Sequence, residues 1–96
     1  MKVLTGASAI LQVAHYGPDG ALHGHTYEIT GWWTGEPCQL EMQSRLKAWV
    51  AKFDHQLLPA KLSRAESIGR ECLMALGCAA VDVDRPLERL YVRIEA

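Results

Sequence analysis

The chain has 96 residues, a length that predicts a single domain spanning residues 1–96. Hydrophobic residues make up 49% of the chain, which excludes an intrinsically disordered protein, and a formal net charge of −1 gives no reason to expect a nucleic acid as partner. No apolar run approaches the roughly 20 residues of a membrane-spanning helix, so we expect no membrane partner. The first residues lack a signal-peptide pattern, and the three cysteines have no disulfide-type spacing; both observations predict a cytoplasmic protein.

The first third of the chain is typical of two strands joined by a turn. Residues 1–15 alternate weakly between apolar and polar side chains, and residues 25–34 alternate more clearly. Between them, Gly17-Pro18-Asp19-Gly20 is a strong turn signal. We therefore expect a β-hairpin.

Three histidines lie at the turn end of this expected hairpin. Strand side chains alternate between faces, so His23 and His25 point the same way, and Gly24 between them leaves room for a close approach. Closing the turn brings His15 beside that pair. Three imidazoles without a fourth protein ligand are typical of a catalytic zinc site, and the alternative is three surface or hydrogen-bonded histidines near a turn.

Two helices are expected in the middle of the chain. Apolar residues at spacings of three and four predict a helix from Leu40 to about Leu57, ended by Pro59. A second helix is predicted from Ser63 to about Leu76. Ser63-Arg64-Ala65-Glu66 has the form of a capping box, and Gly77 stands where a C-terminal glycine belongs.

The chain ends with a predicted connection at Asp82-Val83-Asp84-Arg85-Pro86 and a strand over residues 87–95. The expected order is therefore strand, strand, helix, helix, strand. Helices grouped between antiparallel strands predict an α+β fold, a two-layer sandwich of a sheet and two helices.

Four segments together resemble the 6-pyruvoyl-tetrahydropterin synthase and 6-carboxytetrahydropterin synthase family. They are Val13-Ala14-His15, Leu22-His23-Gly24-His25-Thr26-Tyr27, Phe53-Asp54-His55 and Val92-Arg93-Ile94-Glu95. All four histidines of the chain fall on positions that match the family. The ordered set is far more specific than His-Gly-His alone, and the resemblance spans nearly the whole chain.

The resemblance implies the tunnelling fold, in which antiparallel sheets of several subunits join into a barrel with the helices outside. It also implies a homo-oligomer, commonly a hexamer, that binds Zn²⁺ through His15, His23 and His25. A chain of this size buries only about 60–65% of its unfolded surface, which gives an independent reason to expect oligomerisation.

The same resemblance suggests roles for four residues outside the histidine cluster. His55 would act as general acid and base, with Asp54 setting its tautomer, whereas the pair alone reads as a solvated end of a helix. Glu95 would grip the amino-pyrimidine edge of a pterin through two parallel hydrogen bonds. The family often continues with one more short strand after this position, so the resemblance implies a pocket wall that is either thinner here or borrowed from a neighbour. Glu66 matches a pterin-binding glutamate of the family, and the expected capping box explains it equally well.

Three positions depart from the family pattern. The catalytic cysteine of the family usually stands four residues before the first histidine of His-Gly-His, and here that position is Asp19. Asp19 is interpreted either as a base of a related reaction or as a plain turn aspartate. Arg64 and Ala65 stand where threonines often contact the pterin.

These observations predict a zinc-dependent pterin lyase that acts on 7,8-dihydroneopterin triphosphate or a close relative, with Asp54, His55 and Asp19 as catalytic candidates. A non-catalytic pterin- or purine-binding homologue that kept zinc is the alternative. A third interpretation is a structural zinc that only links the two strands of the hairpin and takes no part in catalysis.

Overall fold

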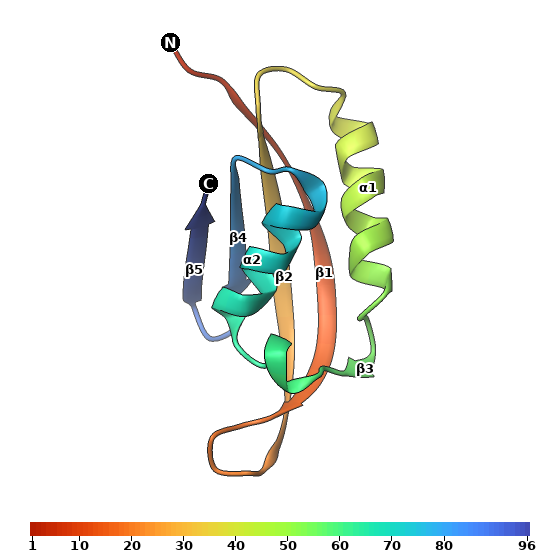
Figure 1. The fold of residues 1–96 in the computed structure, drawn as a ribbon, viewed down its shortest axis with the longest axis vertical. Coiled ribbons are helices and arrows are strands. Elements are labelled where there is room, and N and C mark those ends of the chain that lie inside the picture. The colour runs from red at the N-terminus through yellow and green to blue at the C-terminus, as the bar shows by residue number, and fades with distance from the viewer.

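The computed structural model describes all of residues 1–96, as a five-stranded sheet with two helices against one face (Figure 1). The elements follow in the order β1 (Leu4–Tyr16), β2 (Leu22–Thr34), α1 (Gln39–Ala51), β3 (Gln56–Leu57), the 3₁₀ turn η1 (Ala60–Leu62), α2 (Ala65–Leu76), β4 (Ala80–Arg85) and β5 (Leu90–Glu95). The sheet order is β3-β1-β2-β4-β5, and only the short β1–β3 pair is parallel. The predicted α+β two-layer architecture is confirmed.

The β1–β2 hairpin is the longest feature of the molecule. The two strands pair without interruption from Leu4 opposite Thr34 to Tyr16 opposite Leu22, and the turn lies at the bottom of Figure 1. Gly20 closes the turn with a φ of +76°, a conformation that favours glycine. β2 begins at Leu22 rather than residue 25, so both histidines of His-Gly-His lie within the strand.

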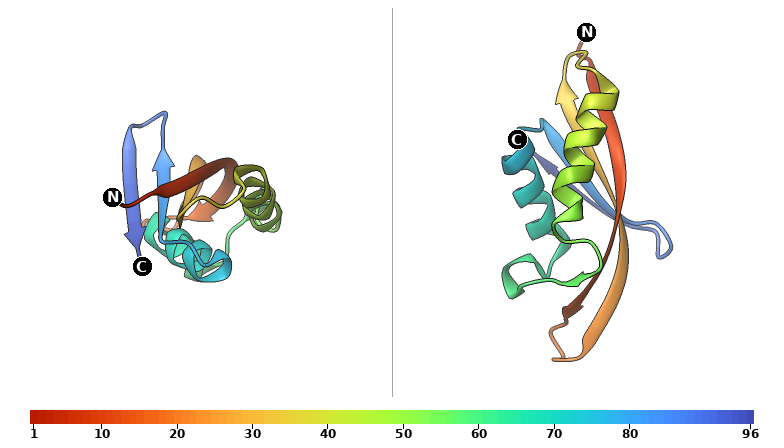
Figure 2. Two further views of the ribbon diagram at one scale, coloured as in Figure 1. Left: turned by 90° about the horizontal axis from the view of Figure 1, so that it is seen from above. Right: turned by 90° about the vertical axis from the view of Figure 1, so that its right-hand side faces the viewer.

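The core fills the space between the sheet and the helix layer. In both views of Figure 2 the helices lie on the same side of the sheet, with α1 against β1 and α2 against β4 and β5. The strands contribute alternate residues to a single cluster of 17 buried side chains, as period-two alternation requires. The helices add the stripe Met42, Leu46, Trp49, Val50, Ile68 and Cys72.

The prediction for the first helix was wrong at its C-terminal end. α1 stops at Ala51, about one and a half turns before the expected Leu57. Turns follow, and His55 takes a left-handed conformation with a φ of +59°. The chain then pairs with β1, where Leu58 donates its N–H to Ala14. Phe53 fits the apolar spacing of the helix although it lies beyond the helix end, because it packs against the same core from the turn that follows.

The capping box predicted at the second helix does not form. α2 begins at Ala65, and its N-cap residue, Arg64, makes no side-chain capping hydrogen bond. Glu66 pairs with Arg64 instead, with 3.2 Å between carboxylate oxygen and Nε. The C-terminal prediction is confirmed, since Gly77 takes a φ of +66° and donates its N–H to Leu73.

The predicted connection at residues 82–86 is wrong, because residues 80–85 form β4. This strand pairs with β2 on one side and with β5 on the other. The expected strand over residues 87–95 is shorter, and β5 starts at Leu90 after a tight turn. Val81 and Val83 point into the core, while Asp82 and Asp84 point to the face that no helix covers.

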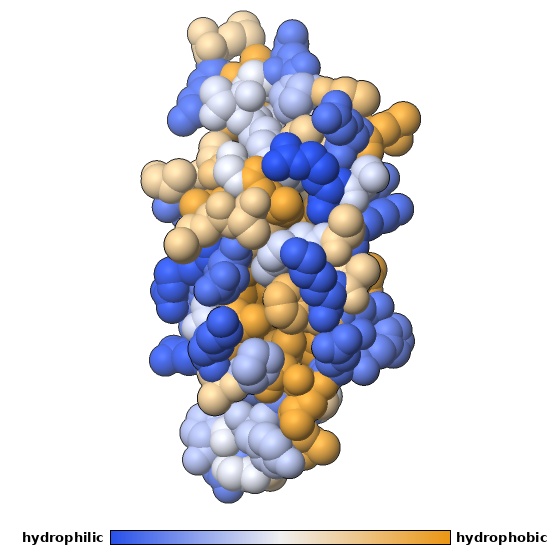
Figure 3. All heavy atoms as spheres, turned by 45° about the vertical axis from the view of Figure 1, so that its right-hand side comes forward, coloured by the Kyte–Doolittle hydropathy of each residue, from blue (hydrophilic) through white to orange (hydrophobic).

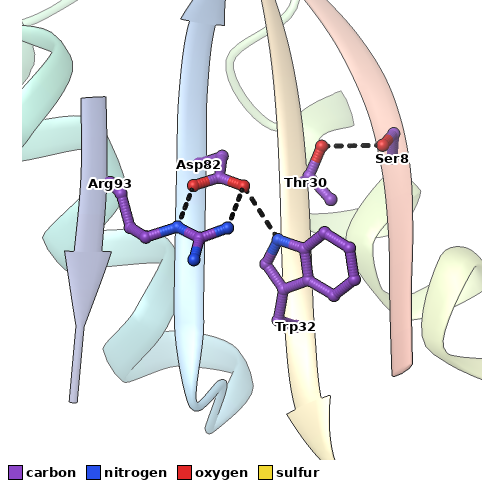
Figure 4. Close-up of polar contacts among 5 residues, drawn as sticks. All are labelled: Ser8, Thr30, Trp32, Asp82 and Arg93. Carbon is purple, nitrogen blue, oxygen red and sulfur yellow. Dashed lines mark hydrogen bonds and ion pairs between the residues drawn. The ribbon is translucent and has the colours of Figure 1, made fainter. Parts of the chain in front are cut away.

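This helix-free face, here called the open face, carries a polar network (Figure 4). The Asp82 carboxylate accepts a hydrogen bond of 2.8 Å from the Trp32 indole and two from Arg93, at 2.7 and 3.1 Å. The hydroxyls of Ser8 and Thr30 are 2.8 Å apart. The Arg93 guanidinium, followed by the Trp32 N–H, holds the pKa of Asp82 below its usual range.

The outer surface still exposes apolar side chains. Figure 3 shows them as orange patches through the middle and lower half of the molecule, between hydrophilic residues on both sides. Exposed apolar residues include Ile10, Leu40, Leu57, Met74 and Tyr91. None of the helices has the length and apolar character needed to span a bilayer.

Candidate functional site

The three histidines cluster at the turn end of the hairpin, as the sequence predicts. His15 lies directly opposite His23 in the strand register, and His25 follows two residues later on the same face. The ring centroids are 4.7 Å apart for His15 and His25, 6.0 Å for His15 and His23, and 6.3 Å for His23 and His25. All three rings face the helix side of the sheet.

The ring separations and the buried nitrogens fit a metal. Imidazoles that bind one tetrahedral zinc at a Zn–N distance of 2.0–2.1 Å have ring centroids about 5 Å apart. Both ring nitrogens of His15 and Nδ1 of His25 are buried without a hydrogen-bond partner. Buried polar atoms are nearly always paired, so these nitrogens call for a ligand.

The ring orientations are not those of a coordination shell. No three His, Cys, Asp or Glu side chains present their atoms together as a metal-binding group. Unlike the buried nitrogens of His15 and His25, His23 has a partner, because its Nε2 lies 3.2 Å from an Asp19 carboxylate oxygen. The donor set therefore fits zinc, and coordination by all three rings requires the rings to turn toward a common point while the Asp19 contact occupies only Nε2 of His23.

Asp19 is held by its own turn. Its carboxylate accepts a hydrogen bond of 3.0 Å from the N–H of Ala21 as well as contacting His23. These two partners, the Ala21 N–H first, hold the pKa of Asp19 below its usual range. Asp19 is thus ionised at neutral pH, which makes it a weak base in this arrangement.

Asp54 and His55 clamp the edge of β1 at Gln12. Asp54 accepts the Gln12 N–H at 2.8 Å, and the His55 N–H donates to the Gln12 carbonyl at 2.6 Å. The other Asp54 oxygen lies 2.9 Å from His55 Nδ1. The hydrogen bond from the Gln12 N–H lowers the pKa of Asp54 most, desolvation raises it, and the contact with His55 lowers it again. The net result is a pKa below the usual range. With Nδ1 bonded to the carboxylate, His55 keeps Nε2 free on an exposed ring.

Two cavities adjoin the histidine cluster. One is an open groove of about 600 Å³ that contains His55, Gly24, His25 and the Leu87-Glu88 turn. The other, of about 370 Å³, lies between the sheet and the start of α2 and is here called the α2 cavity. His15 and Glu66 line only the α2 cavity, whereas His25 lines both.

Glu95 is not brought to the cluster within one chain. It shares the open face with Arg93, whereas the histidines are on the helix side. Glu95 pairs with Ala80 of β4, and Ala80 pairs with Trp32 of β2. Trp32 is seven residues along β2 from His25. At about 3.3 Å per residue, that separation along the strand is roughly 23 Å. Glu66 does reach the cluster, because it lines the same cavity as His15 and His25.

No protein-family model matches this sequence, and no curated protein does either. Among solved structures, the fold matches the structure of Caenorhabditis elegans 6-pyruvoyl tetrahydropterin synthase with a TM-score of 0.82. The match covers 100% of this chain and 96% of that chain at 12% sequence identity. The chain has the 6-pyruvoyl tetrahydropterin synthase fold. The subunit fold that the motifs implied is thereby confirmed.

Within this 6-pyruvoyl tetrahydropterin synthase fold, two residues near the cluster have no role predicted from the sequence. Tyr27 is 3% exposed, and its ring centroid is 5.8 Å from that of His25. Arg85 lies at the end of β4 and lines the α2 cavity with Tyr27. Recognising β4 would have placed Arg85 on the same face as Val81 and Val83, toward the histidines.

Burial and Arg85 set the protonation of the inner residues. Burial lowers the pKa of His25, and the Arg85 guanidinium lowers it further. Burial raises the pKa of Tyr27. His25 is therefore neutral at pH 7, the form in which an imidazole binds a metal.

Proposed function

We propose that this protein is a zinc-dependent lyase that acts on 7,8-dihydroneopterin triphosphate or a related pterin. The observation that supports this best is the cluster of His15, His23 and His25. It stands at the end of the β1–β2 hairpin of a chain whose whole length has the 6-pyruvoyl tetrahydropterin synthase fold. A fold alone does not fix a reaction, so the proposal depends on the residues of the site.

His15, His23 and His25 would hold the zinc, which when bound supplies a Lewis acid for a substrate oxygen. His55 would exchange protons at its free Nε2, while Asp54 fixes the tautomer by accepting the Nδ1 proton. The contact between Asp19 and His23 adds a positioning role for Asp19, which would hold His23 ready beside the other rings.

The pterin would be bound by Glu66 beside the histidines and by Glu95. Because Glu95 lies on the other face of its own chain, we propose that it serves the site of a neighbouring subunit in a homo-oligomer, for which a hexamer is the expected form.

The test is turnover of 7,8-dihydroneopterin triphosphate, with metal content measured on the same samples. Wild type should contain about one zinc per chain and turn over the substrate. The double variant His23→Ala, His25→Ala should lose both, and Arg70→Gln on the exposed side of α2 is the matched control. Full zinc occupancy in the double variant would contradict the metal assignment.

Variants of Asp19 separate an enzyme from a binding protein. If Asp19 is a working base, Asp19→Asn should reduce turnover about 10²–10⁴-fold with little change in pterin binding. If only a thiol is missing, wild type should be inactive and Asp19→Cys should gain activity. Three inactive, zinc-loaded, pterin-binding proteins would refute the enzyme and leave the non-catalytic homologue.

A further inference from the structure

Tyr27 is a buried side chain whose hydroxyl is left free. It lies on β2 two residues after His25, is 3% exposed, and belongs to the cluster of 17 core side chains. Its ring centroid is 5.8 Å from that of His25, and the two rings are tilted by 58°. No group of the chain donates a hydrogen bond to the Tyr27 hydroxyl or accepts one from it. A buried tyrosine hydroxyl normally has such a partner.

The free hydroxyl opens into the α2 cavity. The buried atoms without a partner are both ring nitrogens of His15 and Nδ1 of His25, and the Tyr27 oxygen is not among them, so it is not sealed in the core. The small exposed part of Tyr27 therefore lies where the residue lines the cavity, which measures about 370 Å³. A group that enters this cavity comes within reach of the hydroxyl.

Packing alone does not explain this hydroxyl. The Tyr27 ring fills its place in the core through its carbon atoms, and a phenylalanine ring would bury the same apolar surface without a polar atom. A hydroxyl that is removed from bulk water without gaining a hydrogen bond destabilises the fold. The oxygen of Tyr27 is therefore explained by a ligand rather than by the core.

The Tyr27 hydroxyl differs in charge from the ionised side chains of the cavity. Glu66 is paired with Arg64 at 3.2 Å, and Arg85 donates to the Glu88 carboxylate at 3.3 and 3.2 Å. A phenol hydroxyl is neutral and can both donate and accept a hydrogen bond. Among ligand groups, it matches a neutral alcohol oxygen, which also donates and accepts.

The position beside His25 indicates which part of a ligand the hydroxyl would contact. His25 is one of the three proposed zinc ligands, and the zinc would polarise a substrate oxygen. The oxygens within reach of Tyr27 therefore belong to the part of the ligand that lies near the metal. A reduced pterin such as 7,8-dihydroneopterin carries its alcohol oxygens on the side chain, whereas its ring system presents amide and amino groups.

We propose that the Tyr27 hydroxyl forms a hydrogen bond with a side-chain hydroxyl of a reduced pterin in the α2 cavity, and that Tyr27 thereby selects ligands with a hydroxylated side chain. A site built to bind a ligand hydroxyl rejects an analogue that lacks it, because a buried polar group is then left unpaired. Tyr27 is in this way a specificity-determining residue. The inference rests on the proposed function for the pterin itself.

The test is calorimetric titration of the zinc-loaded protein with 7,8-dihydroneopterin and with 6-methyl-7,8-dihydropterin, whose side chain has no hydroxyl. Wild type should bind 7,8-dihydroneopterin more tightly. Tyr27→Phe removes only the hydroxyl and should weaken 7,8-dihydroneopterin by about 3–10-fold, the usual effect of losing a neutral hydrogen bond. It should leave the affinity for 6-methyl-7,8-dihydropterin within about twofold of wild type.

Tyr16→Phe is the matched control, because it removes the same atom from a side chain that is 60% exposed and lines neither cavity. It should bind both probes as wild type does. Zinc content and the free energy of unfolding are measured for each variant. Tyr27→Phe should keep the zinc and the stability of wild type, since the ring stays in place. Weaker binding that follows a loss of zinc would overturn the direct contact.

The outcomes separate this inference from the proposed function. Unchanged affinity for 7,8-dihydroneopterin in Tyr27→Phe, or an equal loss for both probes, would overturn the inference even if turnover of 7,8-dihydroneopterin triphosphate is observed. A selective loss for 7,8-dihydroneopterin in a protein without turnover would support the role of Tyr27 and refute the lyase. A wild type that binds neither pterin would overturn both.

Discussion

A single carboxylate, Asp82, joins three strands on the open face of the sheet. It accepts hydrogen bonds from Trp32 of β2 and Arg93 of β5 while standing on β4 (Figure 4). Its side chain is 18% exposed, so the contact with Arg93 is only partly screened by water. Asp82 should therefore contribute more to stability than an ordinary surface ion pair.

We expect Asp82→Asn to lower the free energy of unfolding by about 1–3 kcal/mol at pH 7, because hydrogen bonds to a charged group are lost. Ser8→Ala, which removes only the neutral hydroxyl pair on the same face, is the control and should cost about 1 kcal/mol at any pH. Urea unfolding of the three proteins measures both differences.

The cost of Asp82→Asn should depend on pH with a definite sign. The pKa of Asp82 is lowered in the folded protein, so its contribution is fully present above the unfolded value of about 4. The contribution is lost as the pH falls below 4 through the folded pKa. A difference between wild type and Asp82→Asn that stays constant from pH 7 to pH 2.5 would contradict this account.

At the residue level, the sequence predicts the histidine cluster because the cluster depends only on features that are close together in the sequence. Period-two alternation and one turn are enough to bring His15 beside His23 and His25. The clamp that Asp54 forms on Gln12 could not be predicted, since it joins residues 42 positions apart. Neither could the contact of His23 with Asp19, which depends on the close packing of the ring over Gly17.

Among the elements, α2 packs closely against the sheet at Gly69. A Cβ built on this residue would lie 2.7 Å from Cγ1 of Ile94 on β5 and 3.3 Å from Cγ2 of Val83 on β4. Alanine normally stabilises a helix interior by up to about 1 kcal/mol relative to glycine. Here the overlap with the sheet, which typically costs about 1–3 kcal/mol, opposes that gain.

We therefore expect Gly69→Ala to lower the free energy of unfolding. Ile94→Ala removes the side chain that the new methyl group would meet, so it should cost less in the Gly69→Ala background than in wild type. The coupling should be about 0.5–3 kcal/mol, which a double-mutant cycle by thermal or urea unfolding measures. Additive effects of the two substitutions would show that α2 has room to shift.

The elements that sequence reasoning misplaced are those whose residues serve tertiary contacts. The expected helix ran on to Leu57 because Phe53 keeps the apolar spacing while lying outside the helix. β4 was missed because Asp82 and Asp84 suggest a charged connection, although Val81 and Val83, which alternate with them, are buried. A short strand with one face in water has only a weak sequence pattern, and whether the segment forms a strand depends on the strands that pair with it.

At the scale of the whole molecule, both sides of the sheet end in open edges. β5 has a neighbour only on its β4 side, and β1 is paired on its outer side only at Val13 and Ala14. Unpaired edges of this length are uncommon in stable monomers, and apolar side chains of the two edge strands, such as Ile10 of β1 and Tyr91 of β5, remain exposed. This geometry favours a homo-oligomer, which the proposed function also requires, because Glu95 cannot reach the histidines of its own chain.

We expect multi-angle light scattering to show an assembly of several chains at micromolar concentration, with a hexamer as the favoured mass. Tyr91→Lys places a charge on the exposed side of β5, where the side chain is 69% exposed, and should shift the mass toward the monomer. Met74→Lys, at a residue of α2 that is 76% exposed and belongs to the helix layer, should leave the assembly intact. A monomeric wild type would remove the shared pocket, and with it the role proposed for Glu95. An assembly lost in Met74→Lys but kept in Tyr91→Lys would instead place the contacts on the helices.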